Sequence, residues 1–70
     1  MDKTLLTKLA KRMKELRKIK GFTQDDLADK ANVARSTLGN IETAQNDITL
    51  TKLNRIAKAF NLSLSEFLNF

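Results

Sequence analysis

The chain has almost no residues that interrupt a helix, since its 70 residues include no proline and only two glycines. Proline breaks helices because it lacks a backbone N–H, and glycine weakens them by about 1 kcal/mol relative to alanine. Leucine, alanine and lysine are abundant, whereas tyrosine and tryptophan are absent, which disfavours strands. Because a chain this short forms one domain, the sequence predicts a single all-α domain over residues 1–70.

Apolar side chains recur at helical spacing in the first part of the chain. On a helical wheel, Leu5, Leu9, Met13 and Leu16 fall within an arc of about 80°, so we expect this side to face the core. The pattern ends at Gly21. The same reading, continued along the chain, predicts a compact bundle of five helices over residues 4–20, 24–31, 35–43, 50–60 and 64–69.

Three of these helices begin with the same signal, a Ser or Thr N-cap between two apolar residues that form a hydrophobic staple. The caps are Thr23, Thr49 and Ser63. Ser63 has Glu66 at the third helical position, a full capping box, and Thr23 has Asp26 there, an acid that suits the helix dipole. The third predicted helix has only Ala34 as its cap, a loss of about 0.5–2 kcal/mol.

The helix over residues 50–60 has a strongly one-sided distribution of apolar residues. Its apolar side comprises Leu50, Leu53, Ile56, Ala57 and Phe60. We expect Leu53, Ile56 and Phe60 to lie in the core, because an apolar stripe at helical spacing packs against neighbouring helices.

The second and third predicted helices are joined by only about three residues, 32–34, a spacing typical of a DNA-binding helix-turn-helix. Asn32 suits the sharp turn, because asparagine tolerates a left-handed backbone better than most residues. The helix-turn-helix would span residues 23–43. Its second helix carries polar residues, among them Arg35 and Asn40, opposite its apolar side. Arginine can bond guanine and asparagine can bond adenine, so this face is equipped to read a major groove.

From residue 12 to residue 68 the chain resembles the Cro and phage-repressor helix-turn-helix family, also called the xenobiotic-response-element family. The matching stretches are LR at 16–17, KGFTQ at 20–24, DLA at 26–28, VARSTL at 33–38, IE at 41–42 and LSLSEFL at 62–68. The resemblance implies a lambda-repressor-like DNA-binding domain. The chain departs from the family at Gly39 in the recognition helix. It departs again at residues 43–45, where the family commonly has Asn-Gly and a basic residue.

The resemblance also implies a role for particular residues. Base edges would be met by Arg35, Ser36 and Asn40. Phosphates would be met by Thr23, Gln24, Thr37, Thr43, Gln45 and Asn46, and Gln24 would also steady the recognition helix. The family pairs an arginine and a glutamate at the positions of Arg17 and Glu42, a structural salt bridge between the first and third helices.

The charge balance favours a polyanionic partner. The chain has 13 basic and 8 acidic residues, a net charge of +5 and a pI near 9.9. It has no His and no Cys, which removes the usual metal ligands and nucleophiles. We therefore predict no enzyme, catalytic residue, metal site or cofactor. No stretch reaches the roughly 18 apolar residues of a membrane span, so we expect a cytoplasmic protein of a bacterium or phage, at the nucleoid.

The end of the chain is unusually apolar for the terminus of a small domain. The residues concerned are Leu64, Phe67, Leu68 and Phe70. Because Phe70 has little left to pack against within 70 residues, we expect a two-fold dimer through this segment.

These observations support one main hypothesis, a sequence-specific regulator of transcription that binds double-stranded DNA. As a homodimer it would lay the helix over 35–43 in the major groove of a pseudo-palindromic operator. Three alternatives stay open: an antitoxin that binds a toxin protein and regulates its own operon, a controller protein of a restriction-modification system, or a plain helical interaction scaffold.

Overall fold

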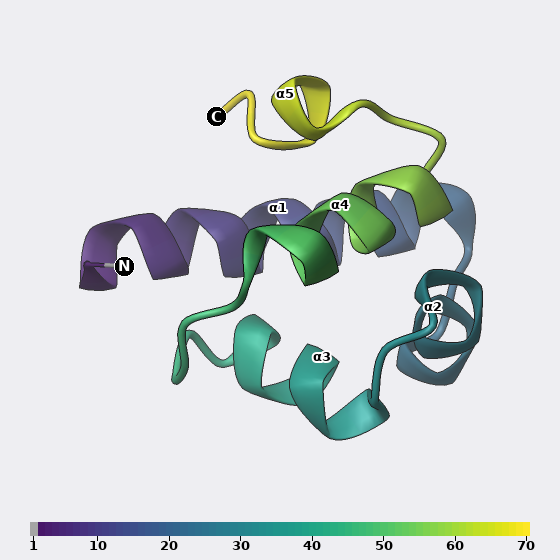
Figure 1. Ribbon diagram of the computed structural model, residues 1–70, viewed down its shortest axis with the longest axis horizontal. Coiled ribbons are helices and arrows are strands. Elements are labelled where there is room, and N and C mark those ends of the chain that lie inside the picture. The colour runs from purple at the N-terminus through teal and green to yellow at the C-terminus, as the bar shows by residue number, and fades with distance from the viewer. Residues whose placement is uncertain (1) are drawn as a thin grey trace.

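The computed structural model describes residues 2–70 and is helical throughout, with no strand in that part of the chain. Its helices are α1 (Lys3–Lys20), α2 (Gln24–Ala31), α3 (Arg35–Glu42), α4 (Leu50–Ala59) and α5 (Leu64–Phe67). Figure 1 shows α1 and α4 in the middle of the molecule, with α3 on one side of them and α5 on the other. The predicted all-α class and the number of helices are confirmed.

The helix ends lie within two residues of their predicted positions. Helix α1 begins at Lys3 because Asp2 is its N-cap, and the Asp2 carboxylate accepts from the Leu5 N–H at 2.7 Å. Helix α5 ends at Phe67, two residues earlier than predicted. No helix between residues 2 and 70 combines the length and the apolar character needed to cross a membrane.

Two helices begin with complete capping boxes. The Asp26 carboxylate accepts from the Thr23 N–H at 2.9 Å, and the Thr23 hydroxyl accepts from the Asp26 N–H at 3.0 Å. Ser63 and Glu66 form the same pair of bonds at the start of α5. Hydrogen bonds from the N-cap backbone lower the pKa of both carboxyl groups below its usual value. Asp26 therefore does more than complement the helix dipole, because it closes a box.

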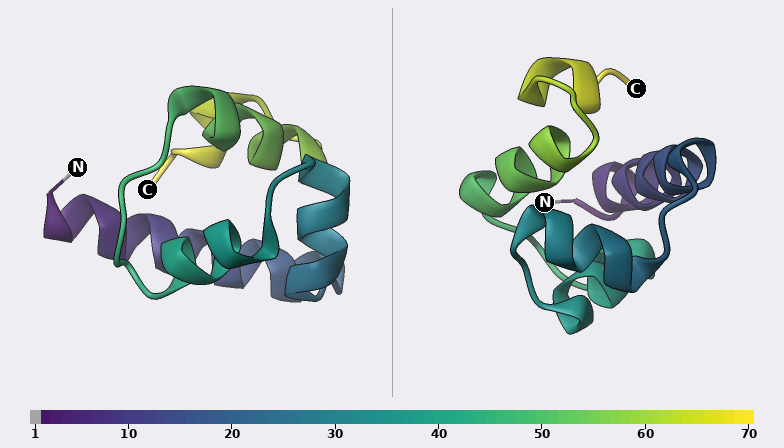
Figure 2. Two further views of the ribbon diagram at one scale, coloured as in Figure 1. Left: turned by 60° about the horizontal axis from the view of Figure 1, so that its bottom comes forward. Right: turned by 90° about the vertical axis from the view of Figure 1, so that its right-hand side faces the viewer.

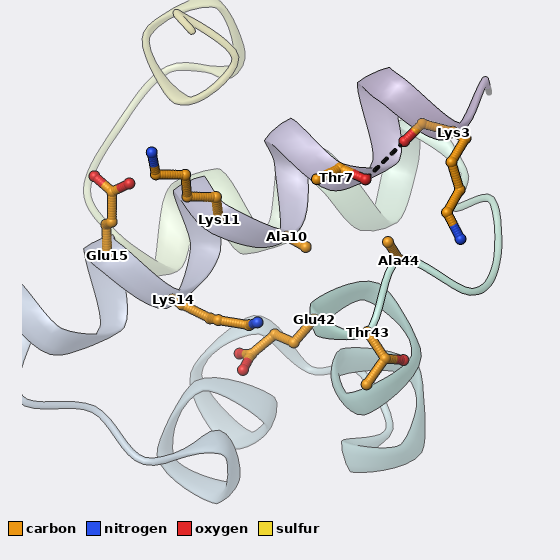
Figure 3. Close-up of a pocket in the computed structure, with 9 residues that line it drawn as sticks. All are labelled: Lys3, Thr7, Ala10, Lys11, Lys14, Glu15, Glu42, Thr43 and Ala44. Atoms are coloured by element: carbon orange, nitrogen blue, oxygen red, sulfur yellow. Dashed lines mark hydrogen bonds between the residues drawn. The ribbon is translucent and has the colours of Figure 1, made fainter.

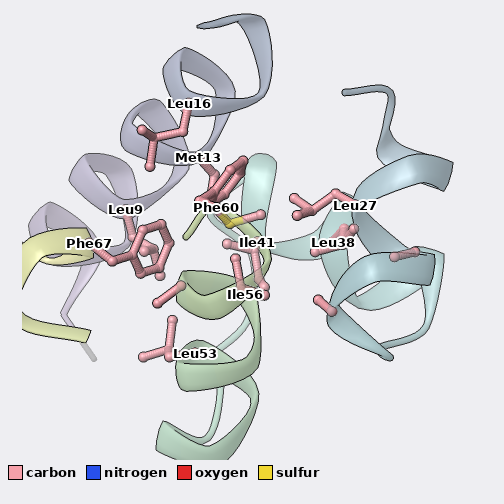
Figure 4. Packing of buried hydrophobic residues seen from close by; sticks show 13 residues of the cluster. Leu9, Met13, Leu16, Leu27, Leu38, Ile41, Leu53, Ile56, Phe60 and Phe67 are labelled. Atoms are coloured by element: carbon pink, nitrogen blue, oxygen red, sulfur yellow. The ribbon is translucent and has the colours of Figure 1, made fainter. Parts of the chain in front are cut away.

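The core is organised around the buried ring of Phe60 (Figure 4). This ring stacks on Phe22, with centroids 6.0 Å apart, and meets Phe67 at the same centroid distance. The expected burial of Leu53, Ile56 and Phe60 is confirmed. The turn after α1, the end of α4 and α5 thus share one aromatic cluster.

Two leucines assigned to apolar faces lie outside the core. Leu5 is 40% exposed and Leu50 is 69% exposed, whereas Leu6 is buried in place of Leu5. Both lie in the first turns of their helices, at the rim of a groove of about 330 Å³ that Leu68 and Phe70 also line. The expectation that Leu5 faces the core was wrong, because Leu6 is the apolar residue of that first turn that is buried. Leu50 lies on the apolar side of its helix but was not among the residues expected in the core.

The expectation that Phe67 takes part in a dimer contact is also wrong, because its side chain is fully buried within its own chain and cannot contact a second copy. Arg12 of α1 holds the end of α5 in place. Its Nε and Nη2 donate to the carbonyl oxygens of Phe67 and Glu66 at 3.0 and 2.9 Å. The apolar end of the chain therefore divides into one core residue and neighbours that stay partly accessible.

Phe67→Ala is expected to lower the free energy of unfolding by about 3–5 kcal/mol, because it removes a fully packed ring. Phe70→Ala is the matched control: Phe70 is 44% exposed, so its loss should cost less than about 1 kcal/mol. Urea denaturation, at a protein concentration low enough to keep the chain monomeric, measures both. Equal losses for the two variants would contradict this assignment of Phe67.

Candidate nucleic-acid interface

Helices α2 and α3 are held in a fixed relation by the turn between them. Asn32 adopts a left-handed conformation with φ 54°, as predicted, and its N–H caps the end of α2. The Val33 N–H then donates to the Ala28 carbonyl at 3.1 Å. Buried side chains on both helices, Leu27 and Leu38 among them, fix the pair onto the core. The geometry is that of a helix-turn-helix.

The side of α3 that does not pack on the core is polar and accessible. Arg35 and Ser36 are exposed, and Asn40 is half-buried. Figures 1 and 2 place α3 along the side of the molecule away from α5. At Gly39 a Cβ would meet no atom within 4 Å, so the backbone there is open to close approach. The three residues expected to read bases therefore share one accessible helix.

A buried carboxylate anchors the other end of α3. Glu42 accepts two hydrogen bonds from Arg17 of α1, from Nε at 2.7 Å and from Nη2 at 2.9 Å. Arg17 also donates through Nη1 to the Phe22 carbonyl at 3.0 Å. The bond to Glu42 raises the pKa of Arg17 above its ordinary value, against the opposing effect of burial. The expected salt bridge between α1 and α3 is present.

Gln24, the first residue of α2, joins this network. Its Nε2 donates to Glu42 Oε1 at 3.2 Å, so part of its amide is used inside the protein. Gln24 therefore helps fix the start of α2 against α3. Its remaining amide hydrogen and its backbone N–H stay available for the phosphate contact that the family resemblance implies.

Arg35 forms an ion pair across the helix-turn-helix, with its Nε 2.7 Å from Oδ1 of Asp25 on α2. Both side chains are largely exposed, at 65% for Arg35 and 73% for Asp25. Sequence reasoning found Arg35 but missed Asp25, because the two residues are ten positions apart and are brought together only by the angle between two helices.

The loop after α3 differs from a phosphate-gripping loop in one respect. The Thr43 hydroxyl lies within hydrogen-bonding distance of the carbonyls of Gly39 and Asn40, at 3.0 and 3.2 Å, so its hydrogen is directed to its own helix. Ala44 adopts φ 56°, which costs an L-residue about 1–2 kcal/mol. Gln45 and Asn46 are exposed and remain candidates for phosphate contact.

Thr23 and Thr37 differ in their hydrogen bonding and exposure, which bear on the predicted phosphate contacts. Thr23 accepts a capping bond, which leaves its hydroxyl hydrogen available to donate. Thr37 is half-buried and lines a polar hollow of about 220 Å³ with Asn40, Asn46 and Lys52. These groups surround the exposed face of α3 with hydrogen-bond donors.

A second, open groove of about 570 Å³ lies between α1 and the end of α3 (Figure 3). Lys3, Lys11 and Lys14 line it, and Figure 3 shows Lys14 extending from α1 toward Glu42. The lysines of α1 are exposed, so they carry much of the positive charge of the molecule on its surface. This charge attracts polyanions without selecting a sequence.

Comparison with known proteins agrees with this geometry. The helix-turn-helix family model matches residues 13–67. Antitoxin HipB of Escherichia coli K12 is 36% identical over 59 residues, which are 84% of this chain and 67% of that protein. A helix-turn-helix transcriptional regulator from Vibrio cholerae has a TM-score of 0.89 at 30% identity, and covers 99% of this chain and 39% of its own.

The restriction-modification controller protein C.AhdI of Aeromonas hydrophila matches over most of both chains, 89% of this one and 94% of its own. Its TM-score is 0.84 and its identity 32%. The fold and the α2–α3 pair define a helix-turn-helix protein. The chain belongs to the helix-turn-helix family of Cro and phage-repressor type.

Glu42→Ala is expected to lower the free energy of unfolding by about 3–5 kcal/mol, because it leaves the partly buried Arg17 without its charge partner. Glu15→Ala, an exposed glutamate on α1, serves as the control; its effect should stay within about 0.5 kcal/mol. Thermal melting followed by circular dichroism measures both. An unchanged melting temperature for Glu42→Ala would show that the bridge contributes nothing.

Proposed function

We propose that this protein is a sequence-specific transcription regulator that binds double-stranded DNA as a homodimer, with α3 of each copy in the major groove of a pseudo-palindromic operator. The observation that carries the proposal is the two-sided character of α3. Its inner side is fixed by Leu38, Ile41 and Glu42, and its outer side presents Arg35, Ser36 and Asn40. Such a helix can insert into a groove without disturbing the core.

The family likeness supports the same role. Members of this family act by binding DNA and not by catalysis. Arg35 would contact guanine, and the exposed donors around α3 would fix its register on the phosphates. We place this role in the cytoplasm, where operator DNA is accessible.

Selection of sites from random duplex DNA should recover a two-fold symmetric sequence that binds at least about a thousandfold more tightly than a scrambled control. Arg35→Ala should cost about 1–3 kcal/mol and remove the preference at one base pair. Arg55→Ala, which removes the same charge from an exposed position on α4, should leave that preference intact. Equal loss by Arg35→Ala on every sequence would contradict base reading by Arg35.

The dimer contact would use an apolar patch formed by Leu5, Leu50, Leu68 and Phe70 around the 330 Å³ groove. This patch comes from both ends of the chain and from the start of α4. Leu64, half-buried in α5, would also take part in the contact, while the buried Phe67 is excluded. A two-fold contact buries the same patch on both copies and presents two α3 helices to half-sites about 34 Å apart.

Leu50→Lys is expected to convert the dimer to a monomer, because it places a charge within the apolar patch. The fold should be retained, since Leu50 is 69% exposed. Ile19→Lys is the control, because Ile19 is 75% exposed and is not part of the patch. It lies near the end of α1, whereas Leu5 of the patch lies near its start. Sedimentation at tens of micromolar, with and without operator DNA, distinguishes the states. A wild-type monomer under both conditions would refute the dimer.

A second candidate function follows from the likeness to antitoxin HipB. In that case the apolar patch would contact a different protein, a toxin, and DNA binding would control the shared operon. A wild-type monomer in sedimentation would favour this candidate, because the patch would then lack a second copy to cover it.

A further inference from the structure

The exposed ion pair between Asp25 and Arg35 suggests a role for a residue that lies outside the recognition helix. We infer that Asp25 is a specificity-determining residue, which holds the Arg35 guanidinium in the orientation that reads a base. The inference rests on the proposed function, because it requires α3 to enter a major groove. It adds to that function a residue of α2 that would not itself touch a base.

The geometry of the pair leaves the reading atoms of Arg35 accessible. Oδ1 of Asp25 lies 2.7 Å from Nε, at the base of the guanidinium group. A bidentate contact with guanine uses two parallel N–H donors toward O6 and N7. The contact at 2.7 Å is made to Nε, which is neither of the terminal nitrogens Nη1 and Nη2. The pair therefore restricts the side chain without occupying both of its end donors.

The position of Asp25 is hard to explain by stability. An ion pair between side chains that are 65% and 73% exposed is weak, because water screens both charges. An acid in the first turn of α2 does favour the helix dipole, but Asp26 already supplies one and also closes the capping box. The start of α2 thus has its stabilising acid without Asp25.

Asp25 would act on DNA binding in two ways, through its negative charge and through its hold on Arg35. A carboxylate beside a DNA-reading arginine repels phosphates, so it lowers affinity for every sequence. Holding the arginine in place saves ordering entropy only where Arg35 finds its base, since only there must the side chain become fixed. Preorganisation alone widens the gap between the operator and other sequences, while the repulsion lowers affinity for all of them by a similar factor.

The test measures affinity for the selected operator and for its variants at the base pair where Arg35→Ala loses its preference. The wild type should prefer the operator base by about 5- to 150-fold. Asp25→Asn should raise affinity for all bases by removing a negative charge, and should reduce the ratio by about 2- to 5-fold, because the operator base alone loses the benefit of preorganisation.

Two controls isolate the contact from the charge. Asp29→Asn removes the same charge from the same helix at an exposed position, and should leave the ratio at wild-type level. In an Arg35→Ala background, Asp25→Asn should have no further effect on the ratio, because its partner is gone. Melting curves should show that both aspartate variants remain folded.

The outcomes separate this inference from the proposed function. If Asp25→Asn raises affinity equally for all sequences, or increases the ratio, Asp25 acts only as a charge or as a competitor for Arg35, and the inference is wrong. If the wild type shows no preference at any base pair, the proposed function itself fails, and the role of Asp25 fails with it.

Discussion

The orientation of α3 depends on the hydrogen bonds that the Glu42 carboxylate accepts. It sits in the last turn of α3 and accepts hydrogen bonds from Arg17 of α1 and Gln24 of α2. One buried charge therefore fixes three helices relative to one another. Hydrogen bonds between charged groups at 2.7 and 2.9 Å are directional, so they fix orientation as well as distance. Together with the packing of the core, this network presents the outer face of α3 at a defined angle.

The helices themselves could be predicted because their signals are local. The capping boxes of Thr23 and Ser63, and the left-handed Asn32, act within a few residues and do not depend on the rest of the fold. The choice between Leu5 and Leu6 was different. Both are apolar and adjacent, and only the positions of the neighbouring helices decide which of them is buried. Phe67 shows the same difficulty, because an apolar residue looks alike whether it packs within one chain or between two.

In the candidate site, too, some features could be predicted from the sequence and others could not. The polar face of α3 follows from helical spacing, whereas the pairing of Arg17 with Glu42 was implied by family resemblance and not by their separation in the chain. The pair of Asp25 with Arg35 was missed. The resemblance implied that Gln24 steadies the recognition helix, but it did not name Glu42 as the partner. Both contacts connect different helices, and the angle at which α2 and α3 cross is set by core packing that no short motif encodes.

The empty space beside Gly39 has a consequence for how such a protein could diverge. Most changes that alter recognition reduce stability, because functional positions are constrained by their neighbours. At Gly39 no atom lies within 4 Å of where a side chain would begin, and glycine inside a helix costs about 0.5–1 kcal/mol relative to alanine. A new side chain at this position would strengthen the helix while it changed the outer surface of α3, which we propose enters the major groove. Gly39 is thus a place where operator preference could evolve in one step without a compensating mutation elsewhere.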